Sequence, residues 1–592
     1  MRASLVIALI PVTFITLFLV APVAYLVGSL ALRVGEGLDY LYVKIPPDGE
    51  LYRVYSVGSS KVIALTGYDF GPLANTLILA SIVSTTTTAL AILTAVACLS
   101  LRGPYRILLG YIAPLIASLP APLVSAYTVI HLFHRDFGLV NRLLGELLGV
   151  KVSLEGIAGV AVYQVISFYP LAHLIILAYM ESMDRSVVES AYNLGGRGLD
   201  VVLRILVPLS KPAIIVALSL TFVLSAEDLS GPIAFSRYNS ARNVLSYTAY
   251  YDFISELGYT ISVRAITYVA ILSIIASTAF IATWRHLRSY AYPIISPSRI
   301  TLDLGLARWP LLTLTLFMVT LSIAPTALVI LYSVTEGWFG SETPRSITLN
   351  NYATVLSNGY YARALLNTIA YVLLALPIAM LLAYISSYAS LRLGGPLSPL
   401  VEVSVVLPIA LPGIAVGIGY FTLFHELFKE IPPLDPMVNP APYIVLAYAS
   451  RRLTYASRPI AASMQKIPRS LEEQALNMGS KPLGVARTIL APLLLNPALV
   501  GGALAAMHMA TEFSVSIVLA GGYGVSPSHP SPVTPVVLNA LTYNPLAVHT
   551  ASALLMAALL SSTISSTIVV LLMTWAISRI RFKDLLFIVK GY

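Results

Sequence analysis

Charged residues are scarce in this sequence. Only 11% of its 592 residues are Asp, Glu, Lys or Arg, whereas 57% are hydrophobic and the mean hydropathy is +0.83. Soluble domains carry about 25% charged residues, so lipid must replace water over most of this surface. The formal net charge of +9 is typical of a membrane protein that keeps Lys and Arg on the cytoplasmic side, and we expect no nucleic acid partner.

Cysteine is nearly absent, and no phosphate loop is found. The single Cys98 excludes an internal disulfide and a Cys-based metal site. The phosphate loop G-x-x-x-x-G-K-[ST] is absent, so we do not expect this chain to hydrolyse ATP itself. Adjacent residues on a helix point in different directions, which argues against a metal site at "MHM" (507–509). We therefore predict no catalytic residue and no metal site, which argues against a membrane-embedded enzyme.

Apolar stretches dominate what remains. A bilayer-spanning helix needs about 20 mostly apolar residues. Twelve stretches are candidates: 4–30, 75–99, 107–132, 156–180, 210–228, 262–284, 309–334, 365–389, 398–424, 441–462, 493–520 and 549–577. We predict an all-α integral membrane protein with about 12 transmembrane helices. The first stretch is too long for the apolar region of a signal peptide, so we expect it to be a retained span.

The basic residues suggest an orientation. If both termini lie in the cytoplasm, most of the Lys and Arg fall in cytoplasmic segments, while the outer segments hold most of the acids. This bias follows the positive-inside rule. We therefore expect a multi-pass protein of the cell membrane with both termini in the cytoplasm.

One polar loop occurs twice. "VVESAYNLGG" (187–196) and "LEEQALNMGS" (471–480) each contain a Glu, an Ala two residues later and a Gly six residues later. Glu473 follows Glu189 by 284 residues (473 − 189), and Glu512 follows Asp228 at the same offset. The charge bias places both loops in the cytoplasm.

The repeat extends beyond the loop. Asn-Thr pairs open the second and the eighth span, at 75–76 and 367–368. Equal starting orientations make the two repeats parallel. We predict two homologous six-helix halves with one linker and two cytoplasmic loops. The boundaries are 1–290 for the first half with its loop at 181–210, 291–308 for the cytoplasmic linker, and 309–592 for the second half with its loop at 463–494.

Local chemistry predicts a short helix in each loop. Ser186 with Glu189, and Ser470 with Glu473, fit the S-x-x-E capping box at a helix start. Gly195 and Gly479 are placed to end these helices in the left-handed conformation. A helix of about nine residues does not persist alone in water. It can lie on its own bundle, but two equal copies favour a partner with two equivalent sites, such as a dimer.

These residues carry a resemblance. Glu189-Ser-Ala191-(three)-Gly195, followed by Ile205-Leu-Val-Pro208, is similar to the EAA loop of permeases of ABC importers, and the second copy is similar too. Each copy departs at the first Ala, which is Ser190 or Gln474. The stretches 407–420 and 447–495 resemble the fused, MetI-like permeases for iron(III) and 2-aminoethylphosphonate.

The resemblance implies a function and its partners. The first helix of each loop would dock on one protomer of an ATP-binding cassette ATPase dimer, which would bind ATP and Mg²⁺, so that this chain carries no cofactor. An extracytoplasmic binding protein would deliver the substrate, imported by alternating access. Iron(III), an organophosphonate, thiamine, a polyamine and a sugar all stay open as substrates. The implied coupling residues are Ser186, Glu189, Ala191, Gly195, Ser470, Glu473, Ala475 and Gly479.

Several polar or helix-breaking residues are candidates for the pathway or its gate. An acid at membrane depth is costly and often functional, while the alternative is an acid at the outer interface. The candidates are Pro120, Pro122, Asp228, Pro412, Gly413 and Glu512. An ion-coupled secondary transporter is the rival function, which the scarcity of ionisable residues in the spans disfavours.

The outer segments gave three further expectations. The alternation of Tyr and Val and the turn sequence "PPDGE" within 31–74 predict a small β-hairpin, with an irregular cap as the alternative. We expect the segments 137–150 and 424–437 to contact the binding protein, with ordinary interfacial helices as the alternative.

Overall fold

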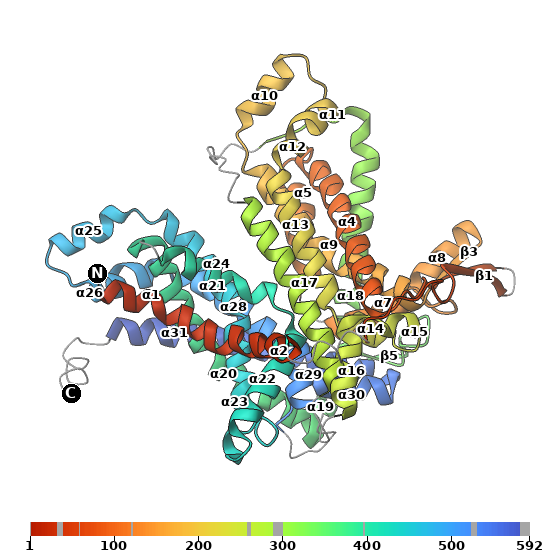
Figure 1. Ribbon diagram of the computed structural model, residues 1–592. Helices are drawn as coiled ribbons and strands as arrows, with labels where there is room; N and C mark the ends of the chain where they lie inside the picture. The colour runs from red at the N-terminus through yellow and green to blue at the C-terminus, as the bar shows by residue number, and fades with distance from the viewer. Residues whose placement is uncertain are drawn as a thin grey trace. The chain divides into compact units, whose positions relative to one another are not determined.

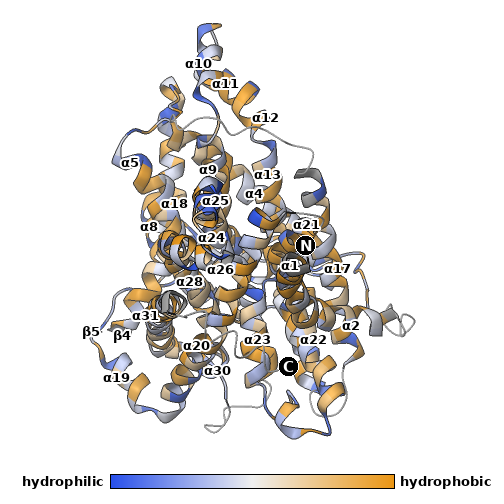
Figure 2. Ribbon diagram, turned by 90° about the vertical axis from the view of Figure 1, so that its left-hand side faces the viewer, coloured by the Kyte–Doolittle hydropathy of each residue, from blue (hydrophilic) through white to orange (hydrophobic). Residues whose placement is uncertain are grey.

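A computed structural model describes residues 2–31, 40–57, 60–119, 122–256, 262–287, 300–394, 397–521 and 530–579. The described residues are mostly helical (Figure 1). Within these described ranges, seven helices could cross a membrane by length and composition, or up to eleven if each of four bent helix pairs counts as one span. Hydrophobic colouring runs along the long helices, and α25 (Arg469–Asn477) is largely hydrophilic (Figure 2). The all-α membrane class is therefore supported.

The number of spans differs slightly from the prediction. Eleven of the twelve expected stretches match a long helix or a bent pair. The twelfth, 441–462, forms α23 (Ala441–Arg451) and α24 (Leu453–Lys466). Arg451, Arg452 and Arg458 make it more polar than the others. The count of twelve is therefore not confirmed.

Six long helices and one N-terminal series run without a sharp bend. The N-terminal series is α1 (Arg2–Ile15), η1 (Thr16–Val20) and α2 (Ala21–Ala31). The long helices are α4 (Pro72–Leu99), α9 (Gly156–Glu181), α17 (Val263–Leu287), α18 (Arg308–Ser333), α20 (Gly359–Tyr388) and α31 (Val548–Arg579).

The other spans are broken. The bent pairs are α5–η2–α6 (Pro104–Ala117) with α7 (Pro122–Leu132), α11–η3–α12 (Gly198–Leu209) with α13 (Lys211–Glu227), α21 (Ser398–Ala410) with α22 (Gly413–Phe428), and η7–α27 (Ala486–Leu493) with α28 (Leu495–Ala510). α26 (Pro482–Val485) leads directly into η7. The second, third and fourth pairs bend by 67°, 101° and 62°.

Proline shapes four of these helices in the same way. The residue before each proline donates its N–H to the carbonyl five residues back, which makes a π-turn. The donors are Ala21, Ala113, Val207 and Ala491. Proline lacks the N–H and crowds the carbonyl four residues back, and a π-turn accommodates this locally. The turns at Val202–Leu206 and Ala486–Leu490 are repeat equivalents.

The chain forms two compact units that do not follow the repeat boundaries. Residues 29–354 and 540–553 form the first unit, and residues 1–28, 355–539 and 554–592 form the second. In the first unit, α18 packs against α4, α6, α7 and α9. In the second, α1 packs against α20 and α21. Each unit thus includes the first helix of the other repeat, and the domain boundaries 1–290 and 309–592 stay a prediction about sequence homology.

A small sheet lies near the start of α4, away from α10 (Figure 1). β1 (Tyr52–Val57) pairs antiparallel with β2 (Ser60–Leu65), which confirms the expected hairpin. The turn at 58–59 lies outside the described residues, and "PPDGE" precedes β1 rather than joining the strands. β3 (Val150–Leu154) adds parallel to β2. The sequence analysis missed β3 because its partner lies far away along the chain.

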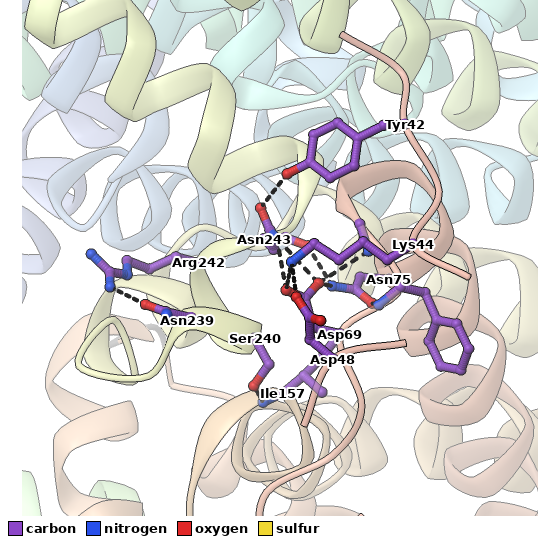
Figure 3. Close-up of polar contacts among 12 residues, drawn as sticks. Tyr42, Lys44, Asp48, Asp69, Asn75, Ile157, Asn239, Ser240, Arg242 and Asn243 are labelled. Carbon is purple, nitrogen blue, oxygen red and sulfur yellow. Dashed lines mark hydrogen bonds and ion pairs between the residues drawn. The ribbon is translucent and has the colours of Figure 1, made fainter. Parts of the chain in front are cut away.

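A buried carboxylate fastens this segment to the helix ends (Figure 3). The Asp69 side chain accepts hydrogen bonds from Lys44 Nζ at 2.6 Å, Asn75 Nδ2 at 2.8 Å and Asn243 Nδ2 at 2.9 Å. Desolvation acts to raise the pKa of Asp69, but these hydrogen bonds, Lys44 first, outweigh it and lower that pKa. Asp69 therefore stabilises the fold above its unfolded pKa, and this contribution is lost as the pH falls through its folded pKa.

We predict that Asp69→Asn loosens the sheet segment by about 1–3 kcal/mol, because it removes charge-assisted hydrogen bonds. Asp48→Asn is the control, since the Asp48 carboxylate binds the same Lys44 at 2.7 Å but is 70% exposed, and it should cost less than about 1 kcal/mol. Amide hydrogen exchange over residues 40–57 and 60–71 measures both. Equal effects would contradict the fastening role of Asp69.

Candidate functional site

The first polar loop contains α10 (Arg185–Asn193). Its N-cap is Asp184, whose carboxylate accepts the N–H of Ser186 at 2.9 Å. Glu189 pairs instead with Arg185 at 2.6 Å on the exposed surface. The predicted capping box of Ser186 and Glu189 is therefore wrong, because Asp is an equally good N-cap residue and starts the helix earlier.

The second loop contains α25 (Arg469–Asn477). Its N-cap is Pro468, whose side chain has no hydrogen-bond acceptor. The predicted capping box of Ser470 and Glu473 is therefore also wrong. The neighbouring Glu472 is the buried acid, and its Oε1 lies 2.6 Å from Arg392 Nε. Arg392 also donates to the carbonyls of Met464 and Ile467. Sequence reasoning missed Glu472 because both glutamates fit a helix equally well.

Both helices end as predicted. Gly195 has φ +84° and Gly479 has φ +87°, a region that L residues rarely adopt. The N–H after each glycine donates to the carbonyl of Ala191 or Ala475, at 3.0 Å in both loops. This is the Schellman motif, which satisfies the open carbonyls of a helix end. The predicted Ala and Gly positions thus share one local geometry in the two loops.

The tip of each loop exposes an apolar side chain. Leu194 is 89% exposed and Met478 is 88% exposed, each directly before the glycine. Within α10, Val188 and Ala191 are buried in their own unit. The first helix therefore lies on its own bundle with one face and offers the other.

Three helix breaks meet in the second unit. Glu512 lies between α28 and α29 (Ser514–Ala520), and its Oε2 accepts the N–H of Val515 at 3.0 Å. Its Oε1 lies 3.4 Å from Arg452 Nη2 and 3.8 Å from Arg451 Nη1, where α23 meets α24. A Cβ at Gly413 would stand 2.1 Å from Arg451 Nη1. The structure thus brings together the Pro412-Gly413 break and Glu512, around arginines that were not predicted as site residues.

Asp228 occupies a similar position in the first unit. Its carboxylate accepts the N–H groups of Ser230 and Gly231, which start α14 (Ser230–Ala234), and Gln164 Nε2 at 3.0 Å. Its backbone carbonyl accepts the hydroxyl of Ser246, as that of Glu512 accepts Thr534. Both acids therefore cap a helix break. A role in the pathway stays a prediction for both.

The proline pair of the first half is only partly visible. The carbonyl of Pro122 accepts the hydroxyl of Tyr163 at 3.0 Å. Pro120 lies outside the described residues.

The Asn-Thr pairs make the same contacts in both halves. Asn75 donates to the carbonyl of Asn243 at 2.8 Å, and Thr76 accepts the N–H of Leu245 at 2.9 Å. In the other half, Asn367 donates to Ser531 at 3.1 Å and Thr368 accepts the N–H of Val533 at 2.9 Å. In each half, the carbonyl that the Asn binds and the N–H that the Thr accepts belong to residues two positions apart. This match supports a duplicated architecture.

The described residues contain no group of three His, Cys, Asp or Glu side chains that could hold a metal ion. His508, in the "MHM" stretch, stacks on Tyr455 with ring centroids 4.1 Å apart. Cys98 is buried in an apolar cluster of the first unit.

Comparison with known proteins identifies relatives among transport permeases. The ferric transport system permease protein FbpB of Actinobacillus pleuropneumoniae is 25% identical over 470 residues, which cover 78% of this chain and 65% of that protein. A putative ferric transport system permease protein FbpB 1 of Haemophilus influenzae is 24% identical over 66% of this chain and 61% of its own length. No family model matches.

A shorter match concerns a putative 2-aminoethylphosphonate transport system permease protein PhnU of Salmonella typhimurium, which is 26% identical over 30% of this chain and 66% of that protein. The predicted resemblance to fused importer permeases of the iron(III) and 2-aminoethylphosphonate type is confirmed. The chain spans slightly less than two thirds of the length of the two ferric permeases.

We predict that Glu472 seats α25, whereas Glu473 does not. Glu472→Ala should destabilise this seat by about 3–5 kcal/mol, because Arg392 stays buried without its partner. The control is Glu473→Ala, at an exposed position one residue along the same helix, which should change stability by less than about 0.5 kcal/mol. Hydrogen exchange over 469–477 in the full chain measures the difference, and equal protection in the two variants would refute it.

Proposed function

We propose that this chain is the permease subunit of an ATP-driven ABC importer. The observation that carries the proposal is the duplicated loop. α10 and α25 have the same length, the same Schellman ending and the same exposed apolar tip at a repeat offset of 284 residues (478 − 194). One chain with two equivalent docking helices fits a dimeric partner, one loop for each protomer. The relatives' names as transport permeases support this.

The energy would come from that partner. The sequence contains no phosphate loop, so ATP and Mg²⁺ would be bound by a separate ATP-binding cassette ATPase dimer. The coupling residues would be Ser186, Glu189, Ala191, Gly195, Ser470, Glu473, Ala475 and Gly479. The side chains of Glu189 and Glu473 are exposed rather than used as caps, so both are available to the partner.

Movement of the loops would reach the spans through short helices. α10 continues through α11 and α12 into α13, which ends just before Asp228. α25 continues through α26 and α27 into α28, which ends just before Glu512. A displacement of either docking helix would therefore act on a helix break. Alternating access would follow if the breaks at Pro122, Asp228, Pro412, Gly413 and Glu512 act as the gate.

The cargo would be a small solute brought by an extracytoplasmic binding protein. Relatives that match along most of this chain are named for ferric transport, which makes iron(III) the first candidate. The shorter match is named for 2-aminoethylphosphonate, so other small ions and organic solutes stay open.

Reconstituted transport tests this function. Proteoliposomes with the chain, its ATPase and the binding protein loaded with iron(III) should accumulate the metal only when ATP and the binding protein are both present. Uptake should survive ionophores that collapse ion gradients. Uptake driven by a gradient without the ATPase would favour the alternative, an ion-coupled secondary transporter.

We also propose that both loops and both termini face the cytoplasm of a cell-membrane protein, as the bias of basic residues suggests. In a Cys98→Ala background, Arg197→Cys or Lys481→Cys should resist an impermeant thiol reagent applied to intact cells and react after permeabilisation. Lys61→Cys, on the outer sheet, is the positive control and should react in intact cells. Labelling of position 197 or 481 from outside would overturn the topology.

A further inference from the structure

The end of the predicted linker, 291–308, is built into the first unit, beside α10. Ile300 is 0% exposed, and Leu302 and Leu304 are each 5% exposed. They belong to one buried apolar cluster with residues of the first loop, namely Val188, Ala191, Val201, Val202 and Leu206. The end of the sequence linker is therefore part of the core on which the first docking helix rests.

Hydrogen bonds fix the path of this segment. The N–H of Leu302 donates to the carbonyl of Leu99 at 3.1 Å, at the end of α4. Arg106 Nη1 donates to the carbonyl of Ile300 at 2.6 Å. The N–H of Asp303 donates to the hydroxyl of Tyr192, which lies on α10 itself, at 3.2 Å.

The segment also packs closely against the start of α11. A Cβ at Gly198 would stand 1.8 Å from the carbonyl oxygen of Asp303. Only glycine allows the two backbones to approach this closely. The segment thus contacts the first loop on both sides of its turn, at α10 and at α11.

The second docking helix has a different seat. Among the described residues of α25, only Glu472 is buried, and it pairs with Arg392. Arg469 Nη2 donates to the carbonyl of Leu391 at 2.6 Å. The two loops share their sequence motif and their helix ending. The first rests on apolar side chains and on the hydrogen bond from Asp303 to Tyr192, whereas the second is held by an ion pair and hydrogen bonds.

We propose that residues Ile300–Leu304 form a linker strap that positions the first docking helix for the ATPase. This rests on the proposed function and goes beyond it. A nine-residue helix cannot hold its shape alone, so whatever packs beneath it sets its orientation. The strap does this for α10, and the pair Arg392–Glu472 does it for α25. Fusion of the two repeats therefore supplies a structural part of the first coupling site, and the two sites fail independently.

Position-specific cross-linking tests the strap. A photo-reactive amino acid replaces Leu194 or Met478 in the full chain, reconstituted with the ATPase, and the cross-linked product is quantified. Leu302→Ser should lower the yield at position 194 by about tenfold and leave position 478 unchanged. Arg392→Gln should lower the yield at position 478 and leave position 194 unchanged. Leu306→Ser is the matched control, since Leu306 is 88% exposed, and it should change neither yield.

The outcomes separate the strap from the proposed function. Equal losses at both positions with Leu302→Ser, or no loss, would overturn the strap. If the unsubstituted chain gave no cross-link to the ATPase at either position, the proposed function would fail. Hydrogen exchange of the chain alone then tests whether the strap supports α10. Leu302→Ser should speed amide exchange in α10 by about tenfold and leave exchange in α25 unchanged. Unchanged exchange in α10 would refute it.

Discussion

A backbone group that leaves a helix inside a membrane must find another hydrogen-bond partner, because lipid offers none. At two helix breaks in this protein, after α13 and after α28, carboxylate side chains are such partners. Asp228 accepts the N–H groups that start α14, and Glu512 accepts the N–H of Val515 at the start of α29. Pro208 and Pro492 are accommodated within their helices by the π-turns that precede them. The breaks are thus defined features, and they follow the two docking loops directly along the chain.

Duplication and its departures carry different information. The Schellman endings and the Asn-Thr contacts are the same in both halves. The seats beneath the docking helices differ, apolar in one half and ionic in the other. Removal of one partner of a buried ion pair leaves the other charge buried and unpaired. An apolar contact tolerates substitutions that conserve volume. We therefore expect α10 and α25 to differ in their sensitivity to mutation.

The exchange of first helices links the two repeats. α18, from the second repeat, packs on α4 and α9, while α1, from the first, packs on α20 and α21. Neither repeat contains all the helices of one compact unit. The strap at Ile300–Leu304 precedes α18 directly, so the helix that completes the first unit and the segment beneath its docking loop come from one continuous stretch of chain.

The sequence by itself determined the features that depend on neighbours within a few residues. Apolar stretches of about 20 residues mark the spans, and Gly195 and Gly479 end their helices in the left-handed conformation because no other residue does so as cheaply. The identical spacing of the two loops also required no structure. The tertiary structure decided what depends on distant partners: that Glu472 rather than Glu473 is buried against Arg392, that Arg451 and Arg452 meet Glu512, that β3 joins the hairpin, and that the linker supports α10. Asp184 as N-cap is a local feature that the capping-box pattern concealed. Burial and pairing are set by residues tens to hundreds of positions away, and the composition of a short segment does not encode them.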